Sequence, residues 1–374
     1  MAALTSTFNW MLATARQADG HVRAEQLVAD IHGDERTLTF DDLNQALEWF
    51  EVERPNLVAA AQQAAATPDV PPHLAGQLIR SLTRFLDLRS HLADWEQLNK
   101  TLLDHARAYG DLAEQAQALH DLGGLAAHQF RNLEAIACLE RSLAMRRQLD
   151  DRDGQARTLN SLGIVHFQLR KYDEAAAFYR ESLALARALG NPAIEAVELG
   201  AIGEVFCEQG RLDEAEAYIR QANALSRSLG FRRSEGRGLT NLAEVWCKQD
   251  RYEEAIDAYE QSLNLLRQIG DRHWGGRDLA GLGDIYRRQG RHDQAITYLT
   301  QAVEALRDTG APFDEAYALW QLGLAFDKRG TTEQATAYLE EALVIFEQLN
   351  RPEAVDVRAL LDSQERSSLA RRRR

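Results

Sequence analysis

Cysteine, proline and long apolar runs are all scarce in this sequence of 374 residues. Three cysteines (Cys138, Cys207 and Cys247) are too few for a disulfide framework, which favours a reducing compartment. The seven prolines leave long stretches free to form helix. No apolar run approaches the roughly 20 residues of a membrane-spanning helix, and the start shows no secretory signal pattern. We therefore expect a cytoplasmic, helical protein without a membrane partner.

Motifs of the common catalytic and cofactor-binding classes are also missing. The sequence has no GxxxxGK[ST] phosphate-binding loop, no HExxH or CxxC pair and no GxSxG nucleophile motif. The formal net charge of −14 disfavours a polyanionic partner, so we expect no nucleic acid to bind this chain alone. The sequence thus predicts a protein that is not an enzyme and that uses no metal and no cofactor. It does not fix the oligomeric state.

What the sequence has in abundance is a pattern that returns every forty residues. A Leu or Ile followed by a small residue recurs, and the small residues are Gly123, Gly163, Gly203, Ala243, Gly283 and Gly323. A leucine lies four residues before each of them, and an alanine lies twelve residues after each, from Ala135 to Ala335. Small side chains let helix backbones approach closely, while leucines fill the remaining space. The fixed period therefore predicts a stack of helix pairs, each packed on its neighbours.

A short turn divides each predicted pair. Residues 210–215 read Gly-Arg-Leu-Asp-Glu-Ala, and residues 290–295 read Gly-Arg-His-Asp-Gln-Ala. We expect the glycine to end the first helix in a left-handed conformation and the acidic residues to open the second helix beside its positive dipole end. The pattern predicts helices of about 15 to 18 residues. It also predicts that Ala215, Ala255 and Ala295 are buried where the two helices of a pair meet.

The repeats are predicted to occupy residues 72–350, as an array of about seven pairs of forty residues each. Residues 1–71 are predicted to form an N-terminal helical segment, and residues 351–374 a capping helix with a basic tail. From residue 363 onward we expect a frayed chain, whose final Arg371 to Arg374 run is solvated.

The N-terminal segment carries two further expectations. Asp41 or Thr39 is expected to cap a helix that runs to Phe50. Pro55 is expected to begin a separate helix, because its missing N–H costs little in a first helical turn.

The repeated residues resemble the tetratricopeptide repeat family. The Leu-Gly pair, the alanine of the turn and the aromatic residue three positions after the glycine slot (Phe206, Trp246, Tyr286 and Phe326) match its pattern. The period is longer than the usual one of about thirty-four residues. It is similar to that of a subclass found in LGN/Pins polarity adaptors and bacterial signal regulators. The resemblance implies an all-α, right-handed superhelix of helix pairs without β-sheet, acting as a protein- or peptide-binding module.

A second resemblance concerns the stretch Ala46–Ala60, just ahead of the repeats. It looks like the start of the repeat domain in actinobacterial regulators of the NB-ARC or STAND type, the antibiotic-regulator family. In those proteins the stretch follows a nucleotide-switch ATPase and a winged helix, and this sequence contains neither. The resemblance implies a sensor domain of such a regulator, or a stand-alone relative.

In the resembled family, first-helix residues outside the packing positions line a concave groove. Carried over to this sequence, the implied partner-binding residues are Arg157, Asn160, Glu204, Arg237, Asn241, Glu244, Lys248, Arg277, Asp284, Arg287, Arg288 and Trp320.

Four arginines of this set come from adjacent repeats, namely Arg237, Arg277, Arg287 and Arg288. Because guanidinium forks match carboxylates, they predict a local positive patch that binds an acidic or C-terminal peptide segment. The alternative is that the arginines pair with the neighbouring carboxylates and only keep the face soluble. Those carboxylates are Glu204, Glu208, Glu244 and Asp284.

Together these features predict a protein- or peptide-binding scaffold. Its expected context is the sensor or interaction domain of a bacterial signalling or transcriptional regulator. Two other functions stay open at this point, a stand-alone adaptor for assembling protein complexes and a peptide-pheromone receptor.

Overall fold

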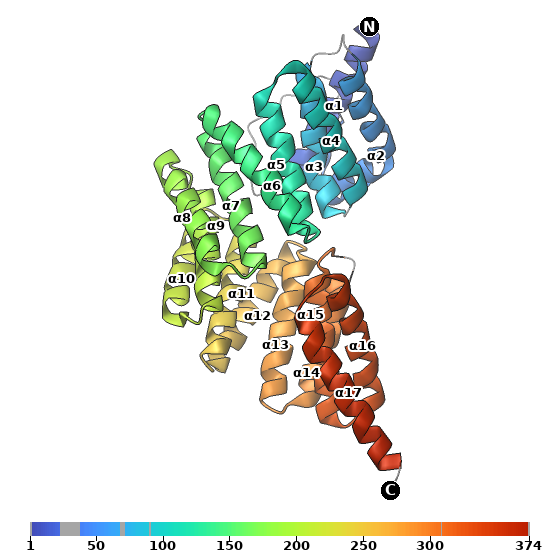
Figure 1. The fold of residues 1–374 in the computed structure, drawn as a ribbon, viewed down its shortest axis with the longest axis vertical. Coiled ribbons are helices and arrows are strands. Elements are labelled where there is room, and N and C mark those ends of the chain that lie inside the picture. Colours follow the sequence, from blue (N-terminus) through green and yellow to red (C-terminus); the bar gives the residue numbers. More distant parts are fainter. Residues whose placement is uncertain (1, 23–37, 68–71, 90, 308, 373–374) are drawn as a thin grey trace. The chain divides into compact units, whose positions relative to one another are not determined.

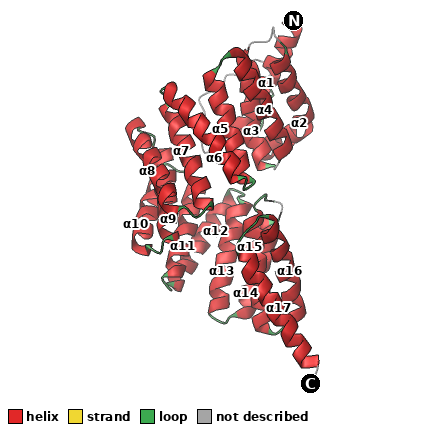
Figure 2. Cartoon of the chain, in the orientation of Figure 1, coloured by secondary structure: helices red, strands yellow, loops and turns green. Residues whose placement is uncertain are grey.

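The computed structural model describes residues 2–22, 38–67, 72–89, 91–307 and 309–372. Over these residues the chain forms seventeen α-helices (Figure 1) and no β-strand (Figure 2). The prediction of an all-α stack of helix pairs is therefore confirmed. None of the described helices is long and apolar enough to cross a membrane.

The chain divides into two compact units, Met1–Asn191 and Pro192–Arg374. The forty-residue period crosses this boundary unchanged and does not indicate it. The first unit contains α1 (Ala2–Val22), α2 (Leu43–Ala66), α3 (Pro72–Leu88), α4 (Leu92–Tyr109), α5 (Leu112–His128), α6 (Asn132–Gln148), α7 (Arg152–Gln168) and α8 (Tyr172–Leu189).

The second unit contains four helix pairs and a terminal helix. Its elements are α9 (Pro192–Glu208), α10 (Leu212–Ser228), α11 (Arg232–Lys248), α12 (Tyr252–Gln268), α13 (Arg272–Arg288), α14 (His292–Leu306), α15 (Pro312–Arg329), α16 (Thr332–Gln348) and α17 (Glu353–Arg372). Each second helix contacts both its own first helix and the first helix of the next pair. Stacking the pairs thus builds one apolar core from α11 to α17, with buried residues from Ala243 to Val357.

Small residues bring the two helices of each pair together, as their spacing predicted. Ala215, Ala255 and Ala295 are fully buried. A Cβ added at Gly203 would lie 2.5 Å from Cγ1 of Ile219, and one at Gly283 would lie 2.5 Å from Cγ of Leu299. Real Cβ atoms do not approach so closely, so the glycine slot is what lets these helices touch. The propensity cost of a mid-helix glycine, about 1 kcal/mol, is offset by this packing.

The turn between the helices of a pair follows the predicted geometry. Gly210 and Gly290 end their helices with a φ of 75°, in the left-handed region where glycine carries no Cβ penalty. Asp250 occupies the same place in the pair between them, with a φ of 59°. Aspartate tolerates this region better than most residues because its short polar side chain bonds locally. The helices α5 to α16 are 15 to 18 residues long, which confirms the predicted length.

Two expectations for the N-terminal segment were wrong. The N-cap of α2 is Asp42, which accepts a 2.9 Å hydrogen bond from the Gln45 amide, and not Asp41 or Thr39. Pro55 lies inside α2 and does not begin a new helix. Phe50 and Leu57, two turns apart on either side of Pro55, are both buried, so core packing holds the helix in one piece.

The terminal helix α17 is also longer than expected. Residues 363–372 are helical, so the prediction of a frayed chain from residue 363 onward was wrong for these residues. Gln364 anchors this part of the helix, because its amide donates to Asp327 at 2.8 Å and its carbonyl oxygen accepts from Thr336 at 3.0 Å. Arg373 and Arg374 lie outside the described residues.

Candidate functional site

The first helices of the second unit form a continuous layer. α9 contacts α11, α11 contacts α13, and α13 contacts α15. Among the residues that the structure describes, the second helices have no comparable mutual contacts, which places the first helices on the inner side of the curved stack. The forty-residue period then sets equivalent side chains beside one another along this layer. Most of the predicted binding residues lie on these helices. Their hydrogen bonds and ion pairs within the protein therefore determine what the surface can bind.

The first link in this layer joins α11 to α9. Arg237 donates a 2.6 Å hydrogen bond to Oε1 of Glu204, thirty-three residues earlier, and Asn241 donates to the same oxygen at 2.6 Å. Burial acts to raise the pKa of Glu204, but the Arg237 guanidinium outweighs it and holds the pKa below its ordinary value. Glu204 therefore stays ionised around neutral pH.

The second link repeats the first one pair further on. Arg277 donates to Oε1 of Glu244 at 2.6 Å, again across thirty-three residues, and its Nε lies 3.9 Å from Asp314 of α15. Asp314 also meets Nε2 of His273 at 2.7 Å. Burial opposes ionisation of Asp314, yet Arg277 and His273 hold its pKa below the ordinary value. Arg277 thus connects α11, α13 and α15.

The third link departs from the pattern. A residue at position 317 would continue the series of Arg237 and Arg277, but it is tyrosine. Asp284, which follows Glu204 and Glu244 in the period, instead accepts from Arg287 at 2.6 Å and from Arg288 at 2.7 Å, both on its own helix. Arg287 continues to α15 by donating to Oε1 of Gln321 at 3.0 Å.

We call this set the charged row: Glu204, Arg237, Glu244, Arg277, Asp284, Arg287, Arg288 and Asp314. It holds four carboxylates and four guanidinium groups. The predicted positive patch therefore does not stand alone, because each of its arginines faces a carboxylate. Glu208, named in the alternative, pairs with Lys248 at 2.8 Å beside the row.

Trp274 is the part of this surface that the sequence did not single out. Its ring contacts two cations, with the ring centroid 5.3 Å from the guanidinium of Arg237 and 4.4 Å from that of Arg277. Such contacts hold a guanidinium in place over the negative face of the indole. Trp274 occupies the same place in the period as Ser234 and Asp314. A large aromatic residue in the first turn of an otherwise polar helix start was the available signal.

The remaining predicted residues are placed differently. Trp320 packs edge-on against Phe346 of α16, with ring centroids 6.1 Å apart, and belongs to the packing of its own pair. Arg157 and Asn160 lie on α7, in the first unit, where Arg157 pairs with Asp153. Ten of the twelve predicted residues are thus on the inner layer of the second unit, and two are not part of it.

Buried titratable groups accompany the row. Burial raises the pKa of Cys207 to about 11 and that of Cys247 to about 12, so both thiols stay protonated and unreactive. No group of three or more His, Cys, Asp or Glu side chains positioned to hold a metal ion occurs among the described residues.

Comparison with known proteins identifies the repeats. The tetratricopeptide repeat family model matches residues 114–188, 194–268, 234–308 and 278–348, more than half of the chain. The chain belongs to the tetratricopeptide repeat family. No curated protein matches it significantly. The narrower resemblances, to STAND-type regulators and to LGN/Pins adaptors, are not shown by these matches.

Solved tetratricopeptide repeat structures share the fold. A Rap protein complexed with Competence and Sporulation Factor has a TM-score of 0.64 at 13% identity, covering 92% of this chain and 99% of its own. The Rap conjugation gene regulator of plasmid pLS20, in complex with the Phr* peptide, has a TM-score of 0.61 at 15% identity, covering 91% and 96%. Aspartyl phosphate phosphatase F from Bacillus subtilis has a TM-score of 0.60 at 12% identity, covering 92% and 94%. At these identities the likeness concerns the fold alone.

Proposed function

We propose that the inner layer of the second unit binds a peptide or an extended segment of a protein partner. The observation that carries this proposal is the charged row, in which seven of the eight charged side chains, from four successive first helices, stay partly open to solvent and only Asp284 is buried. Arg277 and Glu244, for example, keep 29% and 37% of their side-chain surface exposed although they pair with each other. The charged row is therefore a continuous strip of hydrogen-bond donors and acceptors, whose positions are fixed by their own pairing.

A strip of this kind suits an extended chain. A peptide backbone offers alternating N–H donors and C=O acceptors. The row offers carboxylates that accept and guanidinium groups that only donate, both already held in position. Preorganised partners lower the entropic cost of binding, since their rotamers are fixed before the peptide arrives.

The chemistry of the partner follows from the pairing. We propose that an acidic side chain or a C-terminal carboxylate competes for Arg277, Arg287 or Arg288, which are shared with carboxylates of the protein. Because each arginine has five N–H donors, it can bond a ligand carboxylate while keeping one bond to its own partner. Affinity gained this way is smaller than from an unpaired cation, and it depends on the acidic group matching the spacing of the row.

We propose binding and not catalysis as the activity of this surface. The row carboxylates Glu204 and Asp314 have lowered pKa values, so they are poor general acids or bases at neutral pH. Asp278, whose pKa is raised to about 7 by burial, is fully buried and does not reach a substrate. One relative in fold is named a phosphatase, but at 12% identity its chemistry does not transfer.

The proposed biological context is a bacterial signalling or transcriptional regulator, in which this array is the sensor or interaction domain. One structural relative is by its own name a complex with the Phr* peptide, and another is a complex with Competence and Sporulation Factor. That likeness favours the peptide-receptor alternative over a general assembly adaptor. The charged row spans four first helices, and a ligand of peptide size could contact all of them.

The direct test is a peptide-display selection against the full chain, followed by affinity measurements on the enriched sequences. We expect enriched peptides to contain acidic residues or a free C-terminus, and to lose at least about tenfold in affinity to the Arg277→Ala, Arg287→Ala double variant. A matched control is Arg187→Ala, which removes an arginine of α8 in the first unit. No enrichment, or equal binding by the double variant, would contradict the proposal.

The regulatory context has its own test. The native coding sequence upstream of Met1 either encodes an ATPase with a phosphate-binding loop or does not. An ATPase there supports the sensor-domain context, and its absence assigns the chain to a stand-alone adaptor or receptor.

A further inference from the structure

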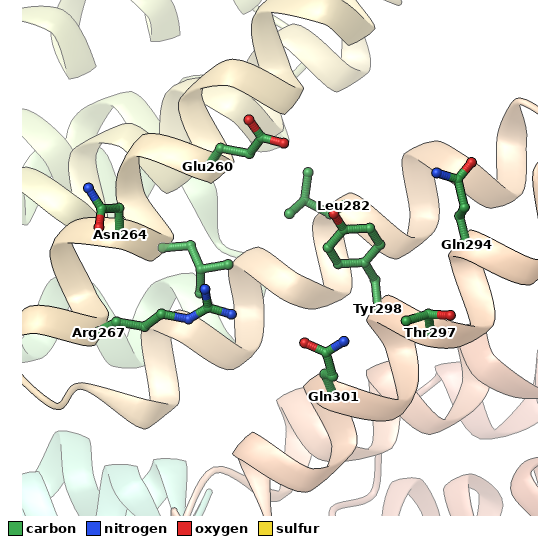
Figure 3. Close-up of a pocket in the computed structure, with 9 residues that line it drawn as sticks. Glu260, Asn264, Arg267, Leu282, Gln294, Thr297, Tyr298 and Gln301 are labelled. Atoms are coloured by element: carbon green, nitrogen blue, oxygen red, sulfur yellow. The ribbon is translucent and has the colours of Figure 1, made fainter.

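A pocket of about 520 Å³ lies on the opposite side of the second unit, between the second helices α12 and α14. Leu282 of the intervening α13 forms part of its floor, and its walls are polar (Figure 3). Glu260, Asn264 and Arg267 come from α12, whereas Tyr298 and Gln301 come from α14. The volume falls within the range of small-molecule sites. None of these residues belongs to the charged row.

Arginines at the end of the second helices normally pair with a carboxylate. Arg147 of α6 meets Glu181 at 2.8 Å, and Arg307, just after α14, meets Glu341 at 3.0 Å, in both cases thirty-four residues ahead. A second acceptor position lies eight residues ahead. There Arg227 meets Glu235 at 2.6 Å, and Arg307 meets Glu315 at 3.7 Å.

Arg267 has the same place in the period but neither acceptor. The residue thirty-four positions ahead is Gln301, and the residue eight positions ahead is Gly275. Arg267 makes no ion pair with any residue that the structure describes, although its equivalents at 147, 227 and 307 all do. Its guanidinium instead reaches toward the open space of the pocket (Figure 3). The repeat thus leaves one cation unneutralised at this site.

An unpaired anion stands at the other end of the same wall. Glu260 lies two helical turns before Arg267, about 10.5 Å along the helix axis. Among the described residues it has no ion-pair or hydrogen-bond partner, and its carboxylate also reaches toward the pocket (Figure 3). Asn264 lies between the two on the same face of α12, because its spacing is i+4 from Glu260. Along α12 the wall therefore carries a carboxylate (Glu260), an amide (Asn264) and a guanidinium group (Arg267) in that order.

We propose that this pocket binds a small zwitterion, a free amino acid or a dipeptide, with its carboxylate on Arg267 and its ammonium group on Glu260. Charge-assisted hydrogen bonds at both ends are each about 2.7–2.9 Å long, and the two charged groups of an amino acid are roughly 3 Å apart. Their sum is about 8.4 to 8.8 Å, against an axial rise of about 10.5 Å between the two residues, a difference that the long side chains of Glu260 and Arg267 can take up, and one further ligand residue adds up to about 3.6 Å. Asn264 and Gln301 supply both donors and acceptors for the rest of the ligand.

The pocket and the charged row are separate surfaces, so the two proposals stand or fall independently. A peptide that binds the row needs no contact with α14. A zwitterion in the pocket touches none of the row arginines.

The test is calorimetric titration of the full chain with free amino acids and dipeptides, beside their N-acetylated and C-amidated forms. We expect at least one free zwitterion to bind, and blocking either of its charges to weaken binding at least about tenfold. Arg267→Gln and Glu260→Gln should weaken it by a similar factor. Equal binding of the blocked forms, or binding of sulfate as tight as of the zwitterion, would overturn the proposal, as would no binding by any member of the panel.

Two variants separate recognition from loss of structure. Gln301→Glu gives Arg267 the carboxylate that Glu341 gives Arg307, so it should abolish zwitterion binding without lowering the melting temperature. Arg307→Gln removes the equivalent arginine of the next pair and should leave binding unchanged. If Gln301→Glu binds like wild type, or Arg307→Gln binds as weakly as Arg267→Gln, the site is not the one proposed.

Discussion

Arg237 donates a 2.6 Å hydrogen bond to Glu204, a residue thirty-three positions earlier on the preceding first helix. Arg277 makes the same bond to Glu244, at the same distance and the same separation in sequence. The repetition follows from the forty-residue period, which places the first helices in equivalent positions. The two arginines also share one contact partner, the ring of Trp274. Each pair therefore both links neighbouring helices and presents charge to the inner layer.

Exchanging the charges of this pair separates its two roles. In the Glu204→Arg, Arg237→Glu double variant the ion pair is kept but its direction is reversed. Asn241 can adapt, because its Oδ1, which has no hydrogen-bond partner in the described part of the chain, can accept from the new arginine. We expect the free energy of unfolding of the double variant to lie within about 1 kcal/mol of the wild-type value, while each single variant loses more stability. Thermal unfolding measures this.

Peptide affinity, unlike stability, should change strongly in the double variant. Reversing the polarity of the first link puts a carboxylate where the ligand needs a donor, so peptides selected on the wild type should bind the exchanged variant at least about tenfold more weakly. If the exchanged variant keeps both its stability and its peptide affinity, the first link does not take part in binding.

Two glycines of α9 offer a matched test of the packing. A Cβ at Gly203 would lie 2.5 Å from Ile219, whereas a Cβ at Gly200 would make an ordinary contact at 3.8 Å with Ala222. We expect Gly203→Ala to destabilise the protein by about 1–3 kcal/mol through overpacking. Gly200→Ala should be neutral or stabilise it by up to about 1 kcal/mol, because alanine is the better helix former. Urea unfolding of both variants decides, and equal effects would show that the glycine slot is not a packing position.

Two alanines of α10 test the same interface from the other helix. Ala215 is fully buried and Ala217, two residues on, is exposed. We expect Ala215→Leu to cost about 1–3 kcal/mol, because the added atoms have no room between the paired helices. Ala217→Leu should change stability by less than about 0.5 kcal/mol. A melting temperature lowered equally by both would place the interface elsewhere on α10.

The sequence predicted the helix pairs well because their packing is local and periodic. Gly203 and Ala215 are set by steric needs that recur every forty residues, so the pattern is visible without a structure. Pro55 could not be predicted in the same way. Its place inside α2 depends on the burial of Phe50 and Leu57 against other helices, and this tertiary contact overrides the local rule for proline.

For the candidate site, the sequence predicts which helices carry the residues and leaves two interpretations of their electrostatics open. The period places Arg237 and Arg277 on the inner layer, and the structure finds them there. Each arginine can point toward a ligand or pair with a carboxylate thirty-three residues away. The choice depends on side-chain rotamers, which the sequence does not specify. The third link shows the limit, because position 317 is a tyrosine and Asp284 pairs with Arg287 and Arg288 of its own helix.

The last prediction concerns Asp278, which is fully buried below the row. Thr240 donates to its Oδ1 at 2.6 Å, while Oδ2 has no hydrogen-bond partner among the described residues. Burial raises the pKa of Asp278 to about 7, from an ordinary value of 3.8, and the bonds from Ser262 and Thr240 only partly oppose this. The folded chain therefore holds a proton here that the unfolded chain has already lost.

Stability should consequently fall as the pH rises from about 4 to about 7, by roughly 4 kcal/mol for this group, and then level off. Below about pH 4 both states carry the proton, so the loss is absent there. Asp278→Asn has the same shape and cannot ionise, which removes this contribution. Arg277 and Glu244, whose charges act on the pKa of Asp278, are present in both proteins and cancel in the comparison. We expect the variant to gain stability over wild type progressively across this pH range, measured by urea unfolding at several pH values. A difference between the two proteins that does not change with pH would show that Asp278 keeps its ordinary pKa in the fold.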